Sequence, residues 1–488
     1  MKRWRDVLSS DCEPFEYASA TGDSSCTLKT FTKRPVSMLS RYDSGPAADH
    51  FQRLPPHPLY DGLNRLLQRW LAGMLAGTFA IIAGAMLCCS GSCGRAPDER
   101  STLNSGAVPF ESTLSSSTAP VCSRTCYFIS PDGNDANAGT SSSAPWRSIA
   151  KVNSVQPRLK PGDSVLFQRG GVWHEQLDIA NMNGSSGLPI TIGNYGTGRL
   201  PVIDGGQTSS VRGRDYCINA INTSFKWITI DGIECRNAYT QGITFKAYSG
   251  AGTNGVGIVV QNSYIHHDGP GACTGCGPIP APDGGGYSNQ LDAQLTTGVQ
   301  FLNNTLDHLG GHNALNVHFD AGGPIVKGNI VGMGSPYCNH NCIDLKGAVG
   351  AQVLNNVISC PQCSSTTAAF YTENTGYHGV SAETITYIGN VVNNVPIGFQ
   401  VETGGACLSH PCSIKARYYN NTIYISRASG FNFIDSSCSN HILDIQKNII
   451  DGGQTDIHSN CTTTWDYNDD GGAYPIKGNP VAHTILSK

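Results

Sequence analysis

Short apolar runs recur between residues 228 and 450, and each is followed by a small residue or an asparagine and then by a second apolar step. The runs read ITIDGIEC, IVVQNSYI, VQFLNNTL, PIVKGNIV, AQVLNNVI, ITYIGNVV, ARYYNNTI and LDIQKNII in chain order. Apolar residues that alternate with a period of two are typical of β-strands. The recurrence itself indicates a repeat architecture. The aligned turn position holds Gly232, Ser263, Asn304, Asn329, Asn356, Asn390, Asn421 and Asn448.

The length of this repeat is variable, because successive turn positions lie about 25 to about 41 residues apart, as in solenoid proteins. One tight turn and loops of variable length elsewhere would give such spacing. A leucine-rich repeat would show leucine at fixed positions, and a propeller would need four strands in about 40 residues. The pattern therefore predicts an all-β fold, a right-handed parallel β-helix of about nine or ten rungs, each rung being one full turn of the coil. Asparagines at the same position of successive rungs would hydrogen-bond in a column.

The segment before the repeat carries a resemblance to a known group of proteins. It reads YFISPDGNDANAGTSSSAPWRSIAKVN from Tyr127, followed by LKPGDSVLFQRGGVWHEQLDI and GLPITIGNYGTGRLPVIDGG. These stretches resemble the opening of secreted right-handed parallel β-helix carbohydrate-active proteins, which have the pectate-lyase-like fold. The resemblance implies an N-terminal cap, and an activity like that of polysaccharide lyases, uronan epimerases or glycosidases. The paired-Asp, Gly-His-Gly and Arg-Ile-Lys signatures of polygalacturonases and the Arg-x-Pro-x-x-Arg signature of extracellular pectate lyases are missing, so it assigns no catalytic residue.

A second strand follows each asparagine turn, and its alignment predicts two outward columns of polar side chains. HNALNVH from His312 matches HNCIDLK from His340 position for position, and AFYTEN, GFQVET and GFNFID continue the series. Alternate residues of a strand face opposite sides, and neighbouring strands lie about 4.8 Å apart. The residues expected to face inward are Leu315, Val317, Ile343, Leu345, Phe399, Val401, Phe431 and Phe433. One outward column, the polar strip, contains His318, Lys346, Glu373 and Glu402, and the adjoining column contains Asn316, Asp344, Tyr371, Gln400 and Asn432.

The polar strip and the adjoining column are the candidate catalytic and substrate-binding residues. In a lyase, Lys346 or His318 would act as the base and Tyr371 as the proton donor. In a glycosidase, Glu373 and Glu402 on adjacent rungs would form a carboxylate pair near 5 Å. The alternative is a solvated strip without a function, in which Lys346 and Glu373 form an ordinary surface ion pair.

Three further roles are expected for these two columns. Asn316, Tyr371 and Gln400 would bind the substrate. Asp344, Glu373 and Glu402 would offer the oxygen ligands that Ca²⁺ prefers. The expected partner is a polysaccharide, which the protein would cleave or modify as a lyase, glycoside hydrolase or epimerase. A non-catalytic, adhesin-like surface β-helix that only binds glycans is the alternative.

A second constellation consists of His266, His267 and Asp268 together with Asp307 and His308. The asparagine alignment places His267 one rung below His308. It places His312 one rung below His340 in the same way. Imidazoles and carboxylates at this spacing would suit a transition metal, or they would fill the turns by hydrogen bonding. The insertion at 268–297 would line a cleft.

The N-terminal part predicts a membrane segment. Residues 70–94 carry no charge, and about 20 apolar residues span a bilayer as a helix. Arginines gather on the N-terminal side of this segment, which places the C-terminal part outside the cytoplasm. A cleaved signal with the small-residue site Ala83-Gly84-Ala85 is the alternative, and the protein would then be secreted. The expected organisation is a disordered tail at 1–69, a transmembrane or signal-anchor helix at 70–94, a flexible linker at 95–120 and the β-helix domain at 121–488.

Cysteine content and charge agree with an extracellular protein. Fourteen of the 19 cysteines lie between Cys122 and Cys461, which suggests disulfides formed in an oxidising compartment. The two C-x-x-C pairs would alternatively each supply half of a zinc site. Only 14% of residues are charged and the net charge is −4, which argues against a nucleic-acid partner. The cysteines that lie close in sequence are Cys122/Cys126, Cys273/Cys276, Cys338/Cys342, Cys360/Cys363 and Cys407/Cys412.

Overall fold

The computed structural model describes residues 122–477 with several gaps. The predicted tail at 1–69, membrane or signal helix at 70–94 and linker at 95–120 all lie outside the described residues. Among the residues that are described, no helix is long and apolar enough to cross a membrane. The gaps are 222, 248–254, 270–288, 309–311, 333–339, 362, 364, 405–406, 408–411, 425–428, 434–439, 452–453, 458–461, 470–475 and 478–488.

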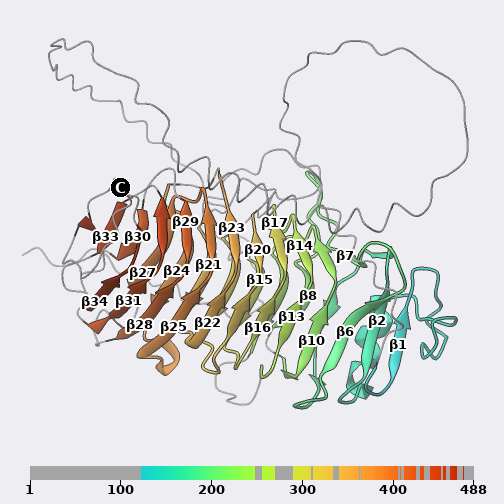
Figure 1. Ribbon diagram of the computed structural model, residues 1–488. Coiled ribbons are helices and arrows are strands. Elements are labelled where there is room, and N and C mark those ends of the chain that lie inside the picture. The colour runs from blue at the N-terminus through green and yellow to red at the C-terminus, as the bar shows by residue number, and fades with distance from the viewer. Residues whose placement is uncertain are drawn as a thin grey trace, which may run out of the picture. The chain divides into compact units, whose positions relative to one another are not determined.

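The described residues form a parallel β-helix, in which the chain coils through three long parallel sheets (Figure 1). The first sheet has 12 strands: β1 (Cys126–Ile129), β2 (Ser164–Gln168), β6 (Ile190–Tyr195), β10 (Ile228–Asp231), β13 (Val259–Gln261), β16 (Gln300–Leu302), β19 (Ile325–Lys327), β22 (Val349–Leu354), β25 (Ala382–Ile388), β28 (Ser413–Tyr419), β31 (Ile442–Gln446) and β34 (Thr462–Asp466).

The second and third sheets complete each rung. The second has 10 strands: β3 (Val172–Trp173), β7 (Val202–Asp204), β11 (Glu234–Arg236), β14 (Tyr264–His266), β17 (Thr305–Asp307), β20 (Ile330–Val331), β23 (Val357–Ser359), β26 (Val391–Asn393), β29 (Thr422–Tyr424) and β32 (Ile449–Asp451). The third has 11 strands: β4 (Leu177–Asp178), β8 (Tyr216–Ile221), β12 (Gln241–Lys246), β15 (Asn289–Gln294), β18 (Asn313–His318), β21 (Asn341–Lys346), β24 (Ala368–Asn374), β27 (Ile397–Thr403), β30 (Ser429–Phe433), β33 (Gln454–Ile457) and β35 (Ile476–Lys477). The predicted parallel β-helix is therefore confirmed.

The remaining elements are short, and helix α2 (Ile149–Val155) belongs to the N-terminal cap. Its N-cap residue is Ser148, whose hydroxyl accepts a hydrogen bond from the Lys151 amide at 3.0 Å. Such a bond satisfies an amide that the helix itself leaves without a partner. The apolar face of α2 buries Ile149 and Val152 in the core. The other short elements are η1 (Gln156–Arg158), η2 (Tyr377–Gly379), β5 (Met182–Asn183) and β9 (Phe225–Lys226).

The asparagine column between the first and second sheets is formed as predicted. Each side-chain amide donates to the side-chain oxygen of the next asparagine, for example from Asn356 to Asn390 at 2.9 Å. The same amide donates to a backbone carbonyl, in this case that of Val326 at 3.0 Å. A buried amide thus satisfies both of its hydrogens, as buried polar groups must. The column contains Asn304, Asn329, Asn356, Asn390, Asn421, Asn448 and also Asn468, which the sequence alignment missed.

The interior is apolar, with aromatic rings stacked from rung to rung. Phe370 stacks on Phe399 at 4.8 Å, and Phe399 stacks on Phe431 at 5.1 Å. Tyr387 and Tyr418 form a parallel stack at 5.0 Å. The expected inward residues are buried, apart from Phe433, whose side chain lies outside the described residues; the buried ones are Leu315, Val317, Ile343, Leu345, Phe399, Val401 and Phe431.

Four disulfides are formed among the described residues. Three join cysteines that are close in sequence, Cys122–Cys126, Cys360–Cys363 and Cys407–Cys412. The pair Cys360–Cys363 is thus oxidised and does not hold zinc, while Cys273, Cys276 and Cys338 lie outside the described residues. Disulfides persist in oxidising compartments, which indicates an extracytoplasmic location.

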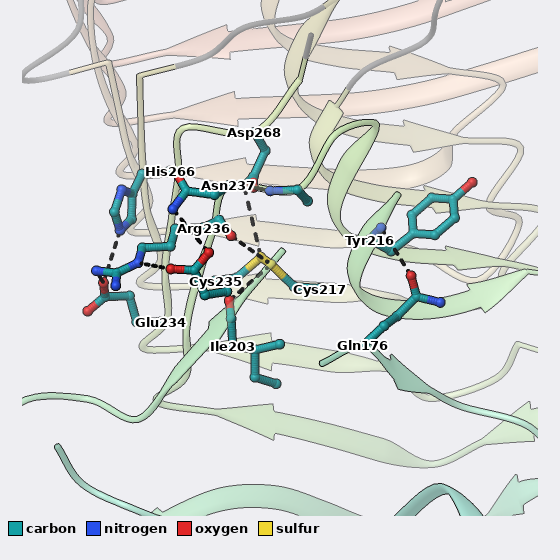
Figure 2. The surroundings of a disulfide bond; sticks show 12 residues. Gln176, Ile203, Tyr216, Cys217, Glu234, Cys235, Arg236, Asn237, His266 and Asp268 are labelled. Carbon is teal, nitrogen blue, oxygen red and sulfur yellow. Dashed lines mark hydrogen bonds and ion pairs between the residues drawn. A yellow bond between two sulfur atoms is a disulfide. The ribbon is translucent and has the colours of Figure 1, made fainter. Parts of the chain in front are cut away.

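The fourth disulfide, Cys217–Cys235, was not predicted. It joins β8 of the third sheet to β11 of the second sheet (Figure 2). Sequence spacing gave no signal for this pair, because its cysteines are 18 residues apart and only the coil brings the two sheets together.

Removing this cross-link should destabilise the coil. We expect the double variant Cys217→Ala/Cys235→Ala to lose about 3 kcal/mol of unfolding free energy, because the bond closes a loop of 18 residues in the unfolded chain. Denaturant titration of the two proteins would measure the difference. The double variant Cys122→Ala/Cys126→Ala, which opens a loop of only 4 residues, should lose less. An unchanged denaturation midpoint in the first variant would contradict the prediction.

Candidate functional site

The strands that carry the predicted site pair in the predicted register. On β18, β21, β24 and β27, His318 pairs with Lys346, Lys346 with Glu373, and Glu373 with Glu402. The polar strip is therefore one continuous column on the third sheet. The adjoining column runs in parallel through Asn316, Asp344, Tyr371, Gln400 and Asn432.

Two short contacts organise the carboxylates of the polar strip. The Lys346 ammonium lies 2.6 Å from Glu373 Oε2, and these side chains are 26% and 15% exposed. The Tyr371 hydroxyl donates to Glu402 Oε2 at 2.6 Å, while Glu402 itself is exposed. A Cβ atom on Gly404 would lie 2.6 Å from Glu373 Oε1, so the glycine leaves room for that carboxylate.

The adjoining column is less exposed than an outward face predicts. Asn316 is 0% exposed, Asp344 is 2% exposed and Tyr371 is 9% exposed, so the expectation that all three face solvent was wrong. The reason is that neighbouring polar side chains close over Asp344. Its carboxylate contacts His318 Nε2 at 3.2 Å and accepts hydrogen bonds from Asn313 at 3.0 Å and Asn341 at 3.3 Å. Asn316 therefore supports the site and does not itself reach a substrate.

Asp344 stays anionic in spite of its burial. Burial alone would raise its pKa, but the hydrogen bond and charge of His318, followed by the charge of Lys346, outweigh it and lower the pKa. A buried carboxylate that is fully hydrogen-bonded in this way is rigidly positioned. It fixes the imidazole of His318 at the start of the polar strip.

The two columns continue over residues that the sequence alignment missed. Asp292 and Gln294 on β15 pair with Asn316 and His318, and Lys246 on β12 pairs with Gln294. The Asp292 carboxylate is buried and accepts hydrogen bonds from Gln241, Thr244 and Gln294 at 3.2–3.3 Å. Burial raises the pKa of Asp292. The signal was present, because NQLDAQ matches NALNVH at each strand position, but the insertion before it hid the match.

His266 ends β14 of the second sheet, whereas His312 and His340 directly precede β18 and β21, the strands that carry the two columns. His267 stacks on His308 at 4.1 Å, as expected from the alignment, and His312 stacks on His340 at 4.1 Å in the same way. His266 contacts His267 at 2.6 Å between their Nδ1 atoms. Its other nitrogen, Nε2, lies 3.2 Å from Glu234 Oε1, as Figure 2 shows.

Asp268 does not join these histidines. It is 1% exposed, its Oδ1 accepts the Ala238 amide at 2.8 Å, and its Oδ2 lies 3.9 Å from the sulfur of Cys235. Burial raises the pKa of Asp268 well above its usual value.

A metal site needs several ligand atoms that converge on one point. Among the described residues, the only group of three that meets this condition within 4.8 Å is Cys217, Cys235 and Asp268. Its two cysteines form a disulfide, so they offer no thiolate to a metal. Neither the histidines nor the three carboxylates expected for Ca²⁺ form such a group. We therefore derive no step through a metal, and calcium binding stays a prediction.

Two of the histidines are held in their neutral form. Burial, followed by the charges of His308 and His266, lowers the pKa of His267 to about 3. Burial, followed by the charge of His340, lowers the pKa of His312 to about 4. In the unfolded chain both side chains take up protons below about pH 6.5, whereas in the folded chain they do not until the pH is far lower.

The consequence is a loss of stability at mildly acidic pH. The unfolded state binds more protons than the folded state between about pH 6.5 and pH 4, so protonation favours unfolding as the pH falls. Between pH 7 and pH 4.5, we expect His267 and His312 together to lower the free energy of unfolding by about 2–3 kcal/mol. This is roughly half of what the two pKa shifts alone would give, because solvent screens the charges. Buried Asp268, Asp292 and Glu383, whose pKa values are raised, act in the opposite direction.

A matched comparison isolates the two histidines. The unfolding free energy of the double variant His267→Gln/His312→Gln should fall less between pH 7 and pH 4.5 than that of the wild type, by this amount. The exposed residue Asn393 supplies the control, since Asn393→Gln removes no titratable group and should leave the slope unchanged. Equal slopes in all three proteins would refute the assignment.

The described residues thus form a parallel β-helix with two polar columns on its third sheet. No protein family model matches the chain. A lacto-N-biosidase of Bifidobacterium longum subsp. longum is 37% identical over an alignment of 130 residues that covers 23% of this chain and 8% of that protein. The chain thus matches less than a tenth of the length of this relative.

Several solved structures are also similar to the chain. A GH136 lacto-N-biosidase from Eubacterium ramulus matches with 15% identity and a TM-score of 0.39, over 74% of this chain and 68% of that one. The pectate lyase Pel9A matches with 14% identity and a TM-score of 0.42, over 75% and 80%. An alginate lyase from a Paenibacillus species matches with 14% identity and a TM-score of 0.39, over 62% and 92%. The predicted resemblance to carbohydrate-active proteins is confirmed by the sequence match to the lacto-N-biosidase.

Proposed function

We propose that this protein is a glycoside hydrolase that cleaves a glycan with the carboxylate pair Glu373 and Glu402. The observation that carries the proposal is their direct pairing on the adjacent strands β24 and β27. Neighbouring strands lie about 4.8 Å apart, and retaining glycosidases hold their two carboxyl groups about 5–5.5 Å apart. The partial identity to a lacto-N-biosidase supports hydrolysis in particular.

The contacts of the two glutamates suit different roles. The Lys346 ammonium lies on Glu373, which favours a group that reacts as an anion, so Glu373 is the nucleophile. Glu402 is exposed and oriented by the hydroxyl of Tyr371, so it is the general acid. Gln400 is partly exposed beside Tyr371 and can donate a hydrogen bond to a sugar hydroxyl.

The reaction then proceeds in two balanced steps. Glu373 attacks the anomeric carbon while Glu402 gives its proton to the glycosidic oxygen, so that the leaving sugar departs as an alcohol. The resulting glycosyl ester on Glu373 is hydrolysed by water, whose proton returns to Glu402. The configuration at the anomeric carbon is retained, because it is inverted twice.

Elimination by a lyase is less well supported. A lyase base must be able to accept a proton, but the Lys346 ammonium is paired with Glu373. The other expected base, His318, is held by the buried carboxylate of Asp344. The expected proton donor, Tyr371, already donates its hydroxyl to Glu402. Tyr371 therefore serves to orient Glu402.

One panel of assays tests the proposal. The protein is incubated with aryl glycosides of lacto-N-biose, with neutral polysaccharides and with uronans, and both reducing ends and ultraviolet absorbance are followed. Hydrolysis predicts reducing ends without absorbance, and NMR of the first product should show retention. Unsaturated products would show that the reaction is an elimination and not a hydrolysis. Binding without any product would instead support a glycan-binding β-helix.

A further inference from the structure

Two ring-bearing side chains lie in the turn that follows β24, the strand that contributes Glu373 to the polar strip. The chain leaves β24, which carries Tyr371 and Glu373, and enters the short turn η2 (Tyr377–Gly379). Tyr377 is 52% exposed and His378 is also exposed. An exposed ring this close to a catalytic strand has no part in the apolar core.

A third ring, that of Phe319, holds this turn from the neighbouring rungs. Phe319 directly follows His318 of the polar strip, and its ring meets His378 edge to face at 4.5 Å. It lies against Gly347, where an added Cβ would come within 2.6 Å of Phe319 Cδ1. Only a glycine at 347 therefore leaves room for the ring. We call Phe319, Tyr377 and His378 the aromatic lip.

The backbone of the lip is strained at two of its three residues. Phe319 has φ +58° and His378 has φ +52°, in the left-handed region that bulky residues rarely adopt. The equivalent turn of the neighbouring rungs has Leu295 at φ +57° and Gly347 at φ +62°, so the positive φ at Phe319 belongs to the turn that follows these strands of the third sheet. This backbone places the Phe319 ring against Gly347 and His378.

We propose that Tyr377 and His378, supported by Phe319, form the subsite that packs against the apolar face of an uncharged pyranose in the substrate. The inference rests on the proposed glycoside hydrolase function and names its substrate class. One face of a pyranose ring exposes mainly C–H bonds, and flat aromatic rings bury such a face while leaving the sugar hydroxyls to polar partners. The polar strip beside the lip supplies those partners.

The exposed carboxylate of the polar strip disfavours acidic glycans. Glu373 is paired with the ammonium of Lys346, whereas Glu402 is exposed and held by the uncharged hydroxyl of Tyr371. A uronate seated beside Glu402 would meet a like charge, and like charges repel. A neutral glycan meets no such repulsion.

Binding measurements on a protein that does not turn over its ligand provide the test. The background is Glu373→Gln, and the probes are lacto-N-biose and trigalacturonate, titrated by isothermal calorimetry or ligand-observed NMR. We expect lacto-N-biose to bind more tightly than trigalacturonate. Adding Tyr377→Ala or His378→Ala should raise the Kd for lacto-N-biose at least tenfold. Tyr424→Ala is the matched control, because Tyr424 is equally exposed, at 51%, but lies on the second sheet.

Phe319 is a positioning residue and needs a different readout. In the active protein, Phe319→Gly should raise KM about tenfold with kcat within twofold, while Tm stays the same or rises because glycine adopts positive φ without strain. Phe319→Tyr should restore KM. A merely structural role for the ring would lower Tm and leave KM unchanged.

Each outcome decides between the inference and the proposed function. Hydrolysis with KM unaffected by the lip variants would overturn the inference alone. Binding that depends on Tyr377, without hydrolysis of any substrate in the panel, would overturn the proposed function alone. Tighter binding of trigalacturonate, or no binding of lacto-N-biose, would also overturn the inference.

Discussion

A Glu373→Gln variant is expected to lose about 10³-fold or more in kcat. The amide keeps the size of the carboxylate but cannot attack the anomeric carbon, and one catalytic carboxylate typically contributes about 10² to 10⁴ in rate. KM should change little, because the ground-state contacts of the sugar are kept. Steady-state kinetics with an aryl glycoside would measure both constants. The smaller variant Glu373→Ala should regain activity with added azide, which attacks in place of the missing carboxylate.

Two further variants test whether the loss of activity is specific to the two proposed catalytic carboxylates. Glu402→Gln should lower kcat about 10²-fold or more. The loss should be smaller with an aryl leaving group, which departs without protonation. Asp451→Asn, which changes an exposed carboxylate on the second sheet, should keep full activity. Activity within tenfold of wild type in both glutamate variants, with the fold intact by circular dichroism, would move the reaction elsewhere on the surface.

The second large effect concerns the asparagine column, where Asn356→Leu is expected to lower the unfolding free energy by about 3–5 kcal/mol. Asn356 is 0% exposed. Its side-chain oxygen accepts both the amide and the side-chain NH₂ of Asn329, and its own NH₂ donates to Asn390. Leucine leaves these buried groups without partners, and each such group costs about 1–3 kcal/mol. Guanidinium denaturation of the two proteins would measure the loss.

A neighbouring asparagine supplies the control for this variant. Asn355 precedes the column, is exposed and has φ +53°. Glycine tolerates this positive φ, so Asn355→Gly should change the free energy of unfolding by no more than about 0.5 kcal/mol, as for most surface substitutions. Equal losses in Asn355→Gly and Asn356→Leu would show that the column contributes nothing beyond the turn itself.

The coil was readable from the sequence because its rungs share one pattern. The asparagine at the turn repeats at the same place in six rungs, and the inward residues around it are apolar, so the register of β18, β21, β24 and β27 followed by alignment. The same alignment placed Lys346 between His318 and Glu373, as the structure does. Period-two alternation fixes which face a residue belongs to.

Other features depend on contacts that alternation does not encode. Facing outward does not mean exposure, as the full burial of Asn316 shows; its side-chain oxygen accepts a hydrogen bond from Asn313 of the same strand. The disulfide Cys217–Cys235 links two different sheets and leaves no mark in the spacing of its cysteines. The position of Phe319 against Gly347 and His378 depends on positive φ at Phe319 and His378. No sequence pattern predicts a positive φ at a phenylalanine or a histidine.

Each rung contributes one residue to the polar strip, and this affects how such a surface can evolve. His318, Lys346, Glu373 and Glu402 come from four successive strands in register, and each rung packs mainly on its two neighbours, as in other solenoids. Duplication of a whole rung within the gene would lengthen the row by one position without disturbing the residues on either side. Deletion of the rung that carries β24 would bring Lys346 directly beside Glu402. The number of sugar units that the surface spans is therefore a quantity that selection can change by whole rungs.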